Sequence, residues 1–564
     1  MSEPSFTTDC VVIGSGPAGG ALGAFLGSYG IKGIMISKLS TTAESPRAHI
    51  TNMATMEVLR DFGTNWYQSL AGEEYARFPA WGNGPEAQLE YQRASPCDMC
   101  DIAQTLMEPI LQRKAVTSGF ICRFNTELVS FEQSEGHVDV RVRDRIFNAE
   151  YTIRTQYLFG ADGARSRIAG ALDLPFVHGE GRGTNVWNLL VEADLSHLVA
   201  HRNGNLQWTF QQDHLNKDFV WAVHPRMVHP YHQWVVGFFV APGTHPANEA
   251  EATEADWVKR IHQFIGDERV EVKILQKSKW QLNQSFATQY SKGRVFCLGD
   301  AVHRHTPGGG LGSNTSIQHS YNLAWKVAHV LKGLAGPSLL ETYSVERQPI
   351  GAHVTKSAME AVFKHMAIWD TFGQNSPSIE SVNQRIEELS EASPQGRELR
   401  RRLREAIGAT RYEHCGIGIE LNQHYRSDAT YIADEGPAPV IHEPLLHYEK
   451  RKYPGWRLPH AWLNKAKPTK PISTMDLAGK GAFASTKAVG ETLGLEIAAY
   501  SIGFRQDWED PEWEWERLRE VDEDGCVLVR PDRFVAWRSK ALLPNCQTKL
   551  LEVMRHVLCL GRLQ

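Results

Sequence analysis

Apolar runs of strand length, each ending in a glycine-containing turn, recur within the first three hundred residues of the chain. They occupy residues 9–13, 157–159 and 294–298. The last run leads through residues 299–312 into an apolar helical pattern that starts at Ile317. This repeated order of strand, turn and helix predicts an α/β fold with a parallel, Rossmann-type sheet. Its turns would present backbone N–H groups and helix N-termini to a ligand that carries negative charge.

Between residues 176 and 290 the pattern changes to short alternating runs, at 186–191, 206–210, 219–224 and 233–240. Such runs predict an antiparallel sheet with one face turned toward the ligand. The aromatic side chains of this region suit a hydrophobic aromatic substrate, although core packing is the simpler explanation for any one of them. The candidates are Trp208, Trp221, His224 and Tyr231.

The first domain is expected to be discontinuous, because the segment at 293–300 returns to complete the sheet that begins at the N-terminus. The predicted domains are a dinucleotide-binding domain over 1–175 and 291–350, an inserted antiparallel-sheet substrate domain over 176–290, a helical connecting region over 351–440 and a smaller α/β domain over 441–564.

Composition narrows the ligand class. A formal net charge of -5 over 564 residues does not indicate the excess of positive charge that binds nucleic acid or an anionic membrane. No uninterrupted apolar stretch is long enough to span a bilayer. Nine cysteines, an odd number, fit free thiols in a reducing compartment, and the Cys97–Cys100 pair fits two structural thiols. A cytoplasmic protein acting on a small molecule is expected.

The first turn has the sequence GxGxxG between a strand and a helix, which predicts a dinucleotide site at Gly14, Gly16 and Gly19, with Pro17 and Ala18 between them. The next strand, at 33–36, is followed by Ser37 and Lys38, where an acidic residue normally binds the ribose hydroxyls. Ser37 can hydrogen-bond a hydroxyl and Lys38 would suit a phosphate, but a solvated lysine at a strand end is equally consistent.

A loop farther along carries Arg47 and His49, which would point the same way on an extended segment. It is followed by a short amphipathic helix that includes Met56 and Leu59 and ends before Gly63.

These motifs, together with Asp162-Gly163 and Gly299-Asp300, occur in the order found in the class A flavoprotein aromatic hydroxylases, a family that the chain resembles. The segments PRAHITN, CDIAQTLMEPIL, YLFGADGARSRI, GRVFCLGDAVHRH and GLGSNTSIQHSYNLAWKVA are most similar to its 2,4-dichlorophenol 6-monooxygenase branch. The resemblance therefore implies that the dinucleotide is FAD.

The resemblance also implies a role for each motif. The GxGxxG glycines would face the FAD pyrophosphate, and Asp300 would bind the ribityl chain or the pyrophosphate side. Arg47 and Gln104 would reach the flavin, while Asp162 and Arg165 would serve FAD and the nicotinamide donor. The turn beside the isoalloxazine ring, where backbone N–H groups can stabilise negative charge, would comprise Pro307, Gly310, Leu311 and Gly312.

The reaction implied is hydroxylation of a phenol or another electron-rich ring with NADH or NADPH and O2, through a flavin C4a-hydroperoxide. His49 is the candidate that accepts the phenolic proton, with a structural histidine beside the flavin as the alternative. Two other functions stay open: a Baeyer–Villiger or dearomatising oxygenase on the same scaffold, and a non-catalytic flavin-binding protein. No metal site is predicted.

The segment from Gly525 to Trp537 resembles part of the thioredoxin-like C-terminal domain of phenol hydroxylase relatives. Cys526 and Cys546 lie in this C-terminal domain without a CxxC motif, so a redox-inert domain that serves packing or dimerisation is expected. A homodimer is a candidate assembly.

Overall fold

The computed structural model describes residues 4–55, 63–67, 74–82, 84–179, 185–201, 204–210, 219–240, 252–373, 376, 378–478, 483–484, 487–495 and 497–561. The short helix expected before Gly63 falls on residues 56–62 and lies outside these ranges. Among the described residues, no helix combines the length and the apolar character needed to cross a membrane. All nine cysteines are free thiols, as predicted.

An eight-stranded sheet forms the centre of the first domain, with its main path ordered β18-β19-β10-β1-β2-β7. Strands β19, β10, β1, β2 and β7 are mutually parallel. Their buried stretches are continuous apolar runs, as expected for strands covered on both faces. The strands are β1 (Phe6–Ile13), β2 (Gly33–Ile36), β7 (Ile121–Arg123), β8 (Thr126–Gln133), β9 (Val138–Asp144), β10 (Ala149–Gly160), β18 (Ser291–Lys292) and β19 (Val295–Cys297).

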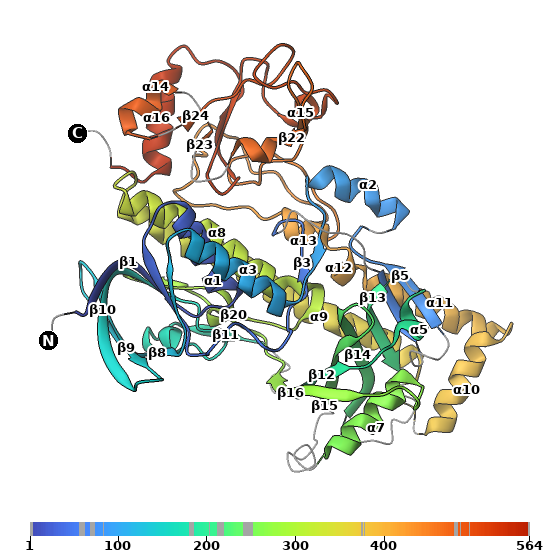
Figure 1. The fold of residues 1–564 in the computed structure, drawn as a ribbon. Helices are drawn as coiled ribbons and strands as arrows, with labels where there is room; N and C mark the ends of the chain where they lie inside the picture. Colours follow the sequence, from blue (N-terminus) through green and yellow to red (C-terminus); the bar gives the residue numbers. More distant parts are fainter. Residues whose placement is uncertain are drawn as a thin grey trace.

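Three helices pack together beside this sheet (Figure 1). They are α1 (Pro17–Ser28), α3 (Gln104–Thr117) and α8 (Leu311–Leu331). The thirty-residue helix α9 (Thr342–Thr371) then runs from the first domain toward the second sheet (Figure 1). Strand β19 thus joins β1 and β10 in one parallel, Rossmann-type sheet, and the domain boundaries stay a prediction.

A seven-stranded sheet, ordered β16-β12-β15-β14-β13-β4-β5, forms the second domain and is antiparallel except where β13 pairs with β4. One face packs on helix α7, and Trp208 on the other side packs against α9 and α11 (Pro394–Ala409). Two of its strands, β4 and β5, come from outside the expected 176–290 segment. The elements are β4 (Gly63–Tyr67), β5 (Glu74–Pro79), β12 (Asn185–Glu192), β13 (Gly204–Phe210), β14 (Phe219–His229), β15 (Gln233–Val240), β16 (Lys273–Gln281) and α7 (Glu254–Ile265).

The chain continues after α9 with the helices α10 (Ile379–Ser390), α11 (Pro394–Ala409), α12 (Arg411–His414) and α13 (Ile417–Leu421). The C-terminal domain packs beside α8 (Figure 1) and contains a four-stranded sheet ordered β24-β23-β25-β26. Strand β23 is parallel to β24, whereas β25 and β26 are antiparallel. Its elements are β23 (Phe483–Ala484), α14 (Lys487–Leu493), β24 (Ile497–Ala498), α15 (Glu514–Leu518), β25 (Cys526–Val529), β26 (Val535–Ser539) and α16 (Cys546–Val557).

Short elements complete the fold: β3 (Ile50–Thr51), α2 (Pro85–Ala94), β6 (Cys100–Asp101), α4 (Arg167–Ala171), β11 (Phe176–His178), α5 (Ser196–Val199), β17 (Ser285–Ala287), β20 (His303–Arg304), β21 (Trp462–Leu463) and β22 (Ile472–Ser473).

Candidate functional site

The three glycine-containing turns meet at one edge of the parallel sheet. Ile13, at the end of β1, is paired with Gly160 of β10, and Gly160 is paired with Cys297 of β19. The residues that follow these strands, including Asp162 and Asp300, therefore emerge side by side. Ligands of open α/β sheets bind at the carboxyl ends of the strands, so this edge is the candidate cofactor site.

The glycines of GxGxxG differ in what surrounds them. A Cβ atom at Gly14, where φ is +106°, would lie 2.0 Å from the Ala161 carbonyl oxygen, and one at Gly19 would lie 2.0 Å from the Gly14 carbonyl oxygen. At Gly16 the nearest atom would be Oε1 of Glu108, at 3.7 Å. Gly16 also caps the N-terminus of α1 without any side-chain hydrogen bond. The turn thus leaves room and N–H groups for a pyrophosphate at Gly16, which fits FAD.

The residues expected near the ribose are differently placed. The hydroxyl of Ser37 is buried and accepts a hydrogen bond from the Leu39 N–H at 3.3 Å. Lys38 is exposed, and its carbonyl accepts a hydrogen bond of 2.5 Å from Arg145. Ribose binding by Ser37 and Lys38 stays a prediction.

One carboxylate oxygen of Asp162 is hydrogen-bonded to the backbone, and the other has no partner among the described residues. Oδ2 accepts from the backbone N–H groups of Arg167, at 2.8 Å, and Ile168, at 3.3 Å. Oδ1 is buried and has no hydrogen-bond partner within the described residues. A donor on a bound cofactor would satisfy Oδ1. Arg165 is exposed beside it.

Asp300 lies in a single 3-10 turn, Gly299–Ala301, and its side chain is accessible to solvent. The surrounding protein still desolvates the carboxylate and raises its pKa, while His305, Arg47 and Arg304 oppose that rise. The structure therefore brings Arg47 into the electrostatic neighbourhood of Asp300. A carboxylate in this position can accept hydrogen bonds from ribityl hydroxyls.

The glycine turn that follows is Gly308–Gly310, immediately before helix α8. Gly309 and Gly310 have φ of +69° and +64°, and a Cβ at Gly310 would lie 2.7 Å from Ile50 Cβ. The buried amide of Asn314 joins this turn to the loop after His49. Its Nδ2 donates to the carbonyls of Ile50 at 2.9 Å and Gly310 at 2.6 Å, and its Oδ1 accepts from the Asn52 N–H at 3.0 Å. Sequence reasoning missed Asn314, although a polar residue on an otherwise buried helix face was a signal.

Gln104 begins helix α3 and connects two parts of the site. Its Nε2 donates to Glu108 at 2.6 Å, and its Oε1 accepts from the Ala48 N–H at 3.4 Å. Glu108 is buried, also accepts from the Ala43 N–H at 2.7 Å, and lies near Gly16. Gln104 and the unpredicted Glu108 thus hold the Arg47 loop against the dinucleotide turn. A direct contact of Gln104 with the flavin stays a prediction.

His49 belongs to a buried chain of charged and polar groups. Its Nδ1 lies 3.5 Å from Asp101 Oδ1, and Asp101 Oδ2 accepts a hydrogen bond of 2.6 Å from Arg226 on β14. Burial lowers the pKa of His49, whereas burial alone would raise the pKa of Asp101 and the attraction of Arg226 and His49 brings it down to about 2. Nε2 of His49 is buried without a hydrogen-bond partner in the described part of the chain. A neutral His49 can therefore offer Nε2 as a proton acceptor.

The aromatic candidates separate into two places. The ring centroid of Trp208 lies 4.7 Å from that of His224, and burial lowers the pKa of His224 to about 3. Tyr231 lies instead at the hairpin turn between β14 and β15, with φ of +66°, and packs with the α7 cluster. The structure brings Trp208 and His224 together but leaves Tyr231 apart, and the side chain of Trp221 lies outside the described residues.

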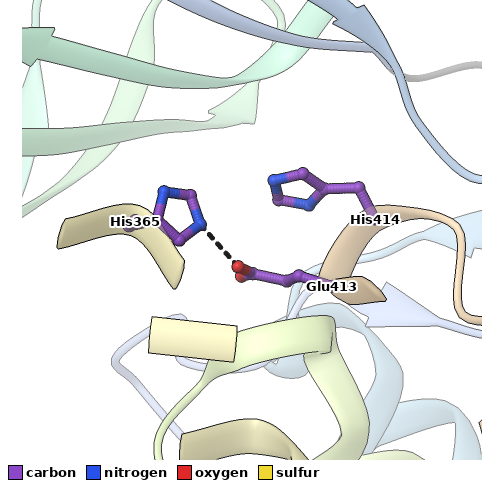
Figure 2. Close-up of side chains that lie close together, drawn as sticks. All are labelled: His365, Glu413 and His414. Atoms are coloured by element: carbon purple, nitrogen blue, oxygen red, sulfur yellow. Dashed lines mark hydrogen bonds and ion pairs between the residues drawn. The ribbon is translucent and has the colours of Figure 1, made fainter. Parts of the chain in front are cut away.

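A cluster that the sequence did not predict adjoins the glycine turn (Figure 2). His365 of α9 donates from Nε2 to Glu413 Oε2 at 2.6 Å, and the other oxygen of Glu413 accepts from the Gly309 N–H at 3.4 Å. His414 completes the cluster, and ligand atoms of the three residues lie within 4.8 Å of one another. Burial alone would raise the pKa of Glu413, but His365 and His414 lower it to about 2. Trp208 packs on His365 with centroids 4.9 Å apart.

Comparison with known proteins identifies the family of this chain. Residues 7–358 match the FAD binding domain family, and residues 451–559 match the family of the aromatic-ring hydroxylase C-terminal region. A 2,4-dichlorophenol 6-monooxygenase of Cupriavidus pinatubonensis (strain JMP 134 / LMG 1197) is 39% identical over 98% of this chain and 96% of its own. A phenol 2-monooxygenase of Pseudomonas sp. (strain EST1001) is 38% identical over 97% and 92%, respectively.

Solved structures give the same result. The flavin-dependent monooxygenase PieE, in complex with FAD and substrate, is similar with a TM-score of 0.91 at 33% identity, over 99% of this chain and 100% of PieE. Aklavinone-11 hydroxylase, in complex with FAD and aklavinone, has a TM-score of 0.78 at 25% identity, with the same coverage.

Proposed function

Since this chain belongs to the FAD-binding aromatic-ring hydroxylases and is an FAD-dependent aromatic monooxygenase, we propose that its substrate is a phenol, which it hydroxylates with NADH or NADPH and O2. One observation carries the phenol assignment. The buried His49–Asp101–Arg226 chain is connected through Ile50 to the glycine turn at Gly308–Gly310, and it ends in an imidazole nitrogen able to take a phenolic proton. The relatives named above support it by their activities.

FAD, when bound, accepts hydride from the reduced nicotinamide and supplies the chemistry by which one atom of O2 reaches the ring. The residues of this chain would bind and orient the cofactor. Gly16 and the N-terminus of α1 would bind the pyrophosphate, with Gly14 and Gly19 shaping the turn around Pro17 and Ala18. Asp300 and Asp162 would accept hydrogen bonds from the cofactor, with Arg47 and Arg165 at its charged groups. Leu311 and Gly312 would present backbone N–H groups to the ring, with Pro307 and Gly310 shaping the turn beside it.

His49 would hold the phenolic proton during hydroxylation. Since burial lowers its pKa, the imidazole is neutral at pH 7, and Asp101 orients it by accepting from Nδ1. Nε2 is then free to accept. A more electron-rich phenolate reacts faster with an electrophilic oxygen, so removal of this proton favours the reaction.

The substrate ring would lie against Trp208 and His224 of the second sheet, which excludes water from the reacting atoms. Trp221 and Tyr231 stay predicted contacts. The boundaries at 176, 291, 351 and 441 are proposed as predicted, with residues 63–79 added to the substrate domain because β4 and β5 pair there.

We also propose a thioredoxin-like topology for residues 441–564. The order of its four strands, the parallel first pair and the antiparallel second pair support this assignment. Cys526 and Cys546 are exposed and free, so a redox-inert packing or dimerisation role is proposed. Light scattering of the purified protein distinguishes a homodimer from a monomer, and cell fractionation tests the cytoplasmic location.

The experiment for the function uses the purified holoenzyme. Oxidation of NADH and of NADPH is followed with and without phenol, 2,4-dichlorophenol and catechol, and products are identified by mass spectrometry with isotope-labelled O2. We expect phenol-dependent oxidation and a product that has gained one labelled oxygen as a hydroxyl group. A ring-expanded or dearomatised product would instead assign the second candidate, and the absence of any stimulated turnover would contradict the proposal.

A further inference from the structure

His365 is held in one tautomer by its neighbour. Glu413 accepts at both of its oxygens, from the Gly309 N–H at 3.4 Å and from Nε2 of His365 at 2.6 Å, so Nε2 of His365 carries the proton. In the neutral ring, Nδ1 then keeps a lone pair, and Figure 2 shows this nitrogen turned away from the carboxylate. The side chain is only 2% exposed, and Nδ1 has no hydrogen-bond partner among the described residues. In this tautomer of the neutral ring, Nδ1 is an acceptor for which the described residues provide no donor.

The adjoining ring, Trp208, carries a donor for which the described part of the chain provides no acceptor. The centroid of Trp208 is 4.9 Å from that of His365, and the indole N–H is also buried without a partner in the described part of the chain. Buried polar groups in native proteins are normally satisfied by protein, water or ligand. One hydroxyl group both donates and accepts, so a single hydroxyl can satisfy both rings.

The location connects these two rings with the reaction site. Glu413 accepts from the N–H of Gly309, and Gly310, the next residue, packs against Ile50 beside His49. Two histidine–carboxylate pairs therefore approach the same glycine turn, His49–Asp101 through Ile50 and His365–Glu413 through Gly309. His49 is assigned to the first hydroxyl, and the second pair has no role in that reaction.

We propose that His365 and Trp208 bind a second hydroxyl group of the aromatic substrate, so that the enzyme prefers a dihydroxylated ring to a simple phenol. This inference rests on the proposed function and adds a specificity-determining site to it. The cluster's donor atoms could also surround a metal ion. Metal-bound histidines, however, normally donate their outer nitrogen to a carbonyl or carboxylate, and the described residues provide none for His365.

The test measures binding to the oxidised holoenzyme by the change in flavin absorbance. The probes are catechol, resorcinol and hydroquinone, each paired with the fluorophenol in which fluorine replaces one hydroxyl group. We expect at least one dihydroxybenzene to bind about 10-fold or more tightly than its fluorophenol, because a site built for a hydroxyl rejects an analogue without one. His365→Phe should abolish that preference.

Trp208→Phe keeps an aromatic ring and removes only the N–H, so it should reduce the preference even if His365→Phe fails to retain FAD. His232→Phe, at an exposed site, is the matched control and should behave as the wild type. No preference in the wild type, or the same preference in both site variants, would overturn the inference. A stoichiometric metal in the holoenzyme that chelation removes would also overturn it. Because binding is measured without turnover, failure here is separate from failure of phenol-stimulated NAD(P)H oxidation.

Discussion

At the scale of single residues, the two glycines Gly16 and Gly19 should respond differently to the same added methyl group. A Cβ at Gly19 would lie 2.0 Å from a backbone oxygen, so Gly19→Ala should destabilise the protein even without FAD. A Cβ at Gly16 would make only an ordinary contact, 3.7 Å from Glu108 Oε1, so the Gly16→Ala apoprotein should fold normally. It should bind FAD about 10- to 100-fold more weakly, the equivalent of one lost charge-assisted hydrogen bond. Thermal melting of the apoproteins and FAD titration distinguish the two; equal FAD affinity of Gly16→Ala and wild type would contradict the pyrophosphate assignment.

His49 gives a prediction about pH. Burial lowers its pKa from the ordinary 6.5, so the neutral, proton-accepting form persists below pH 6.5 and is lost only as the pH falls through the lowered value. Hydroxylation should therefore hold its rate at pH 6.5 and decline at lower pH. His49→Asn should slow hydroxylation by about 100-fold or more at neutral pH. Rapid-mixing measurements of product formation across pH provide the check, with His232→Asn as an exposed control. Unchanged rates in His49→Asn would leave His49 with a structural role.

Residue types in a motif could be predicted, but their partners could not. The positions of Gly14, His49 and Asp300 follow from short segments of sequence. Asp101 and Arg226, in contrast, are 125 residues apart, and His365 and Glu413 are 48 apart. No local spacing records such pairs, because only the tertiary packing of separate elements brings them together.

At the scale of elements, Asn314 connects helix α8 to the loop that carries His49. Asn314→Ala would leave the Ile50 and Gly310 carbonyls and the Asn52 N–H without this partner. Leaving buried backbone groups unpaired should lower the free energy of unfolding by about 1–3 kcal/mol. It should also release the loop, and so raise KM for the phenol more than it weakens FAD binding. Urea unfolding and steady-state kinetics test this, with Ser313→Ala on the same helix as control; a stability loss with unchanged KM would limit Asn314 to a structural role.

Elements were predictable where the local pattern decides them. Strands β1 and β10 end in continuous apolar runs, and β19 is one throughout, because both faces of the parallel sheet are covered there. Strands β4 and β5 were not predicted, since β4 joins the second sheet by parallel pairing with β13, far away in sequence. Such pairing depends on tertiary contacts rather than on a run of residues.

At the scale of the whole molecule, a buried ionic network joins the C-terminal domain to the FAD-binding domain. Glu346 of α9 contacts Lys326 of α8 at 2.7 Å and Arg530 at 2.6 Å, and Arg530 also contacts Asp532 at 2.6 Å. These side chains are at most 1% exposed. Two positive and two negative groups balance one another, so removal of one charge leaves an uncompensated charge in the interior.

Glu346→Gln should accordingly lower the stability by about 3–5 kcal/mol at pH 7, as measured by thermal or urea unfolding. Burial alone would raise the pKa of Glu346, but Arg530 and Lys326 hold it well below the ordinary 4.5. The stabilisation by its charged form is thus present above pH 4.5 and is lost as the pH falls below it. The difference in stability between wild type and Glu346→Gln should narrow in acid. Glu398→Gln, on the exposed face of α11, should change little. A Glu346→Gln variant as stable as the wild type at pH 7 would show that the network does not hold the C-terminal domain in place.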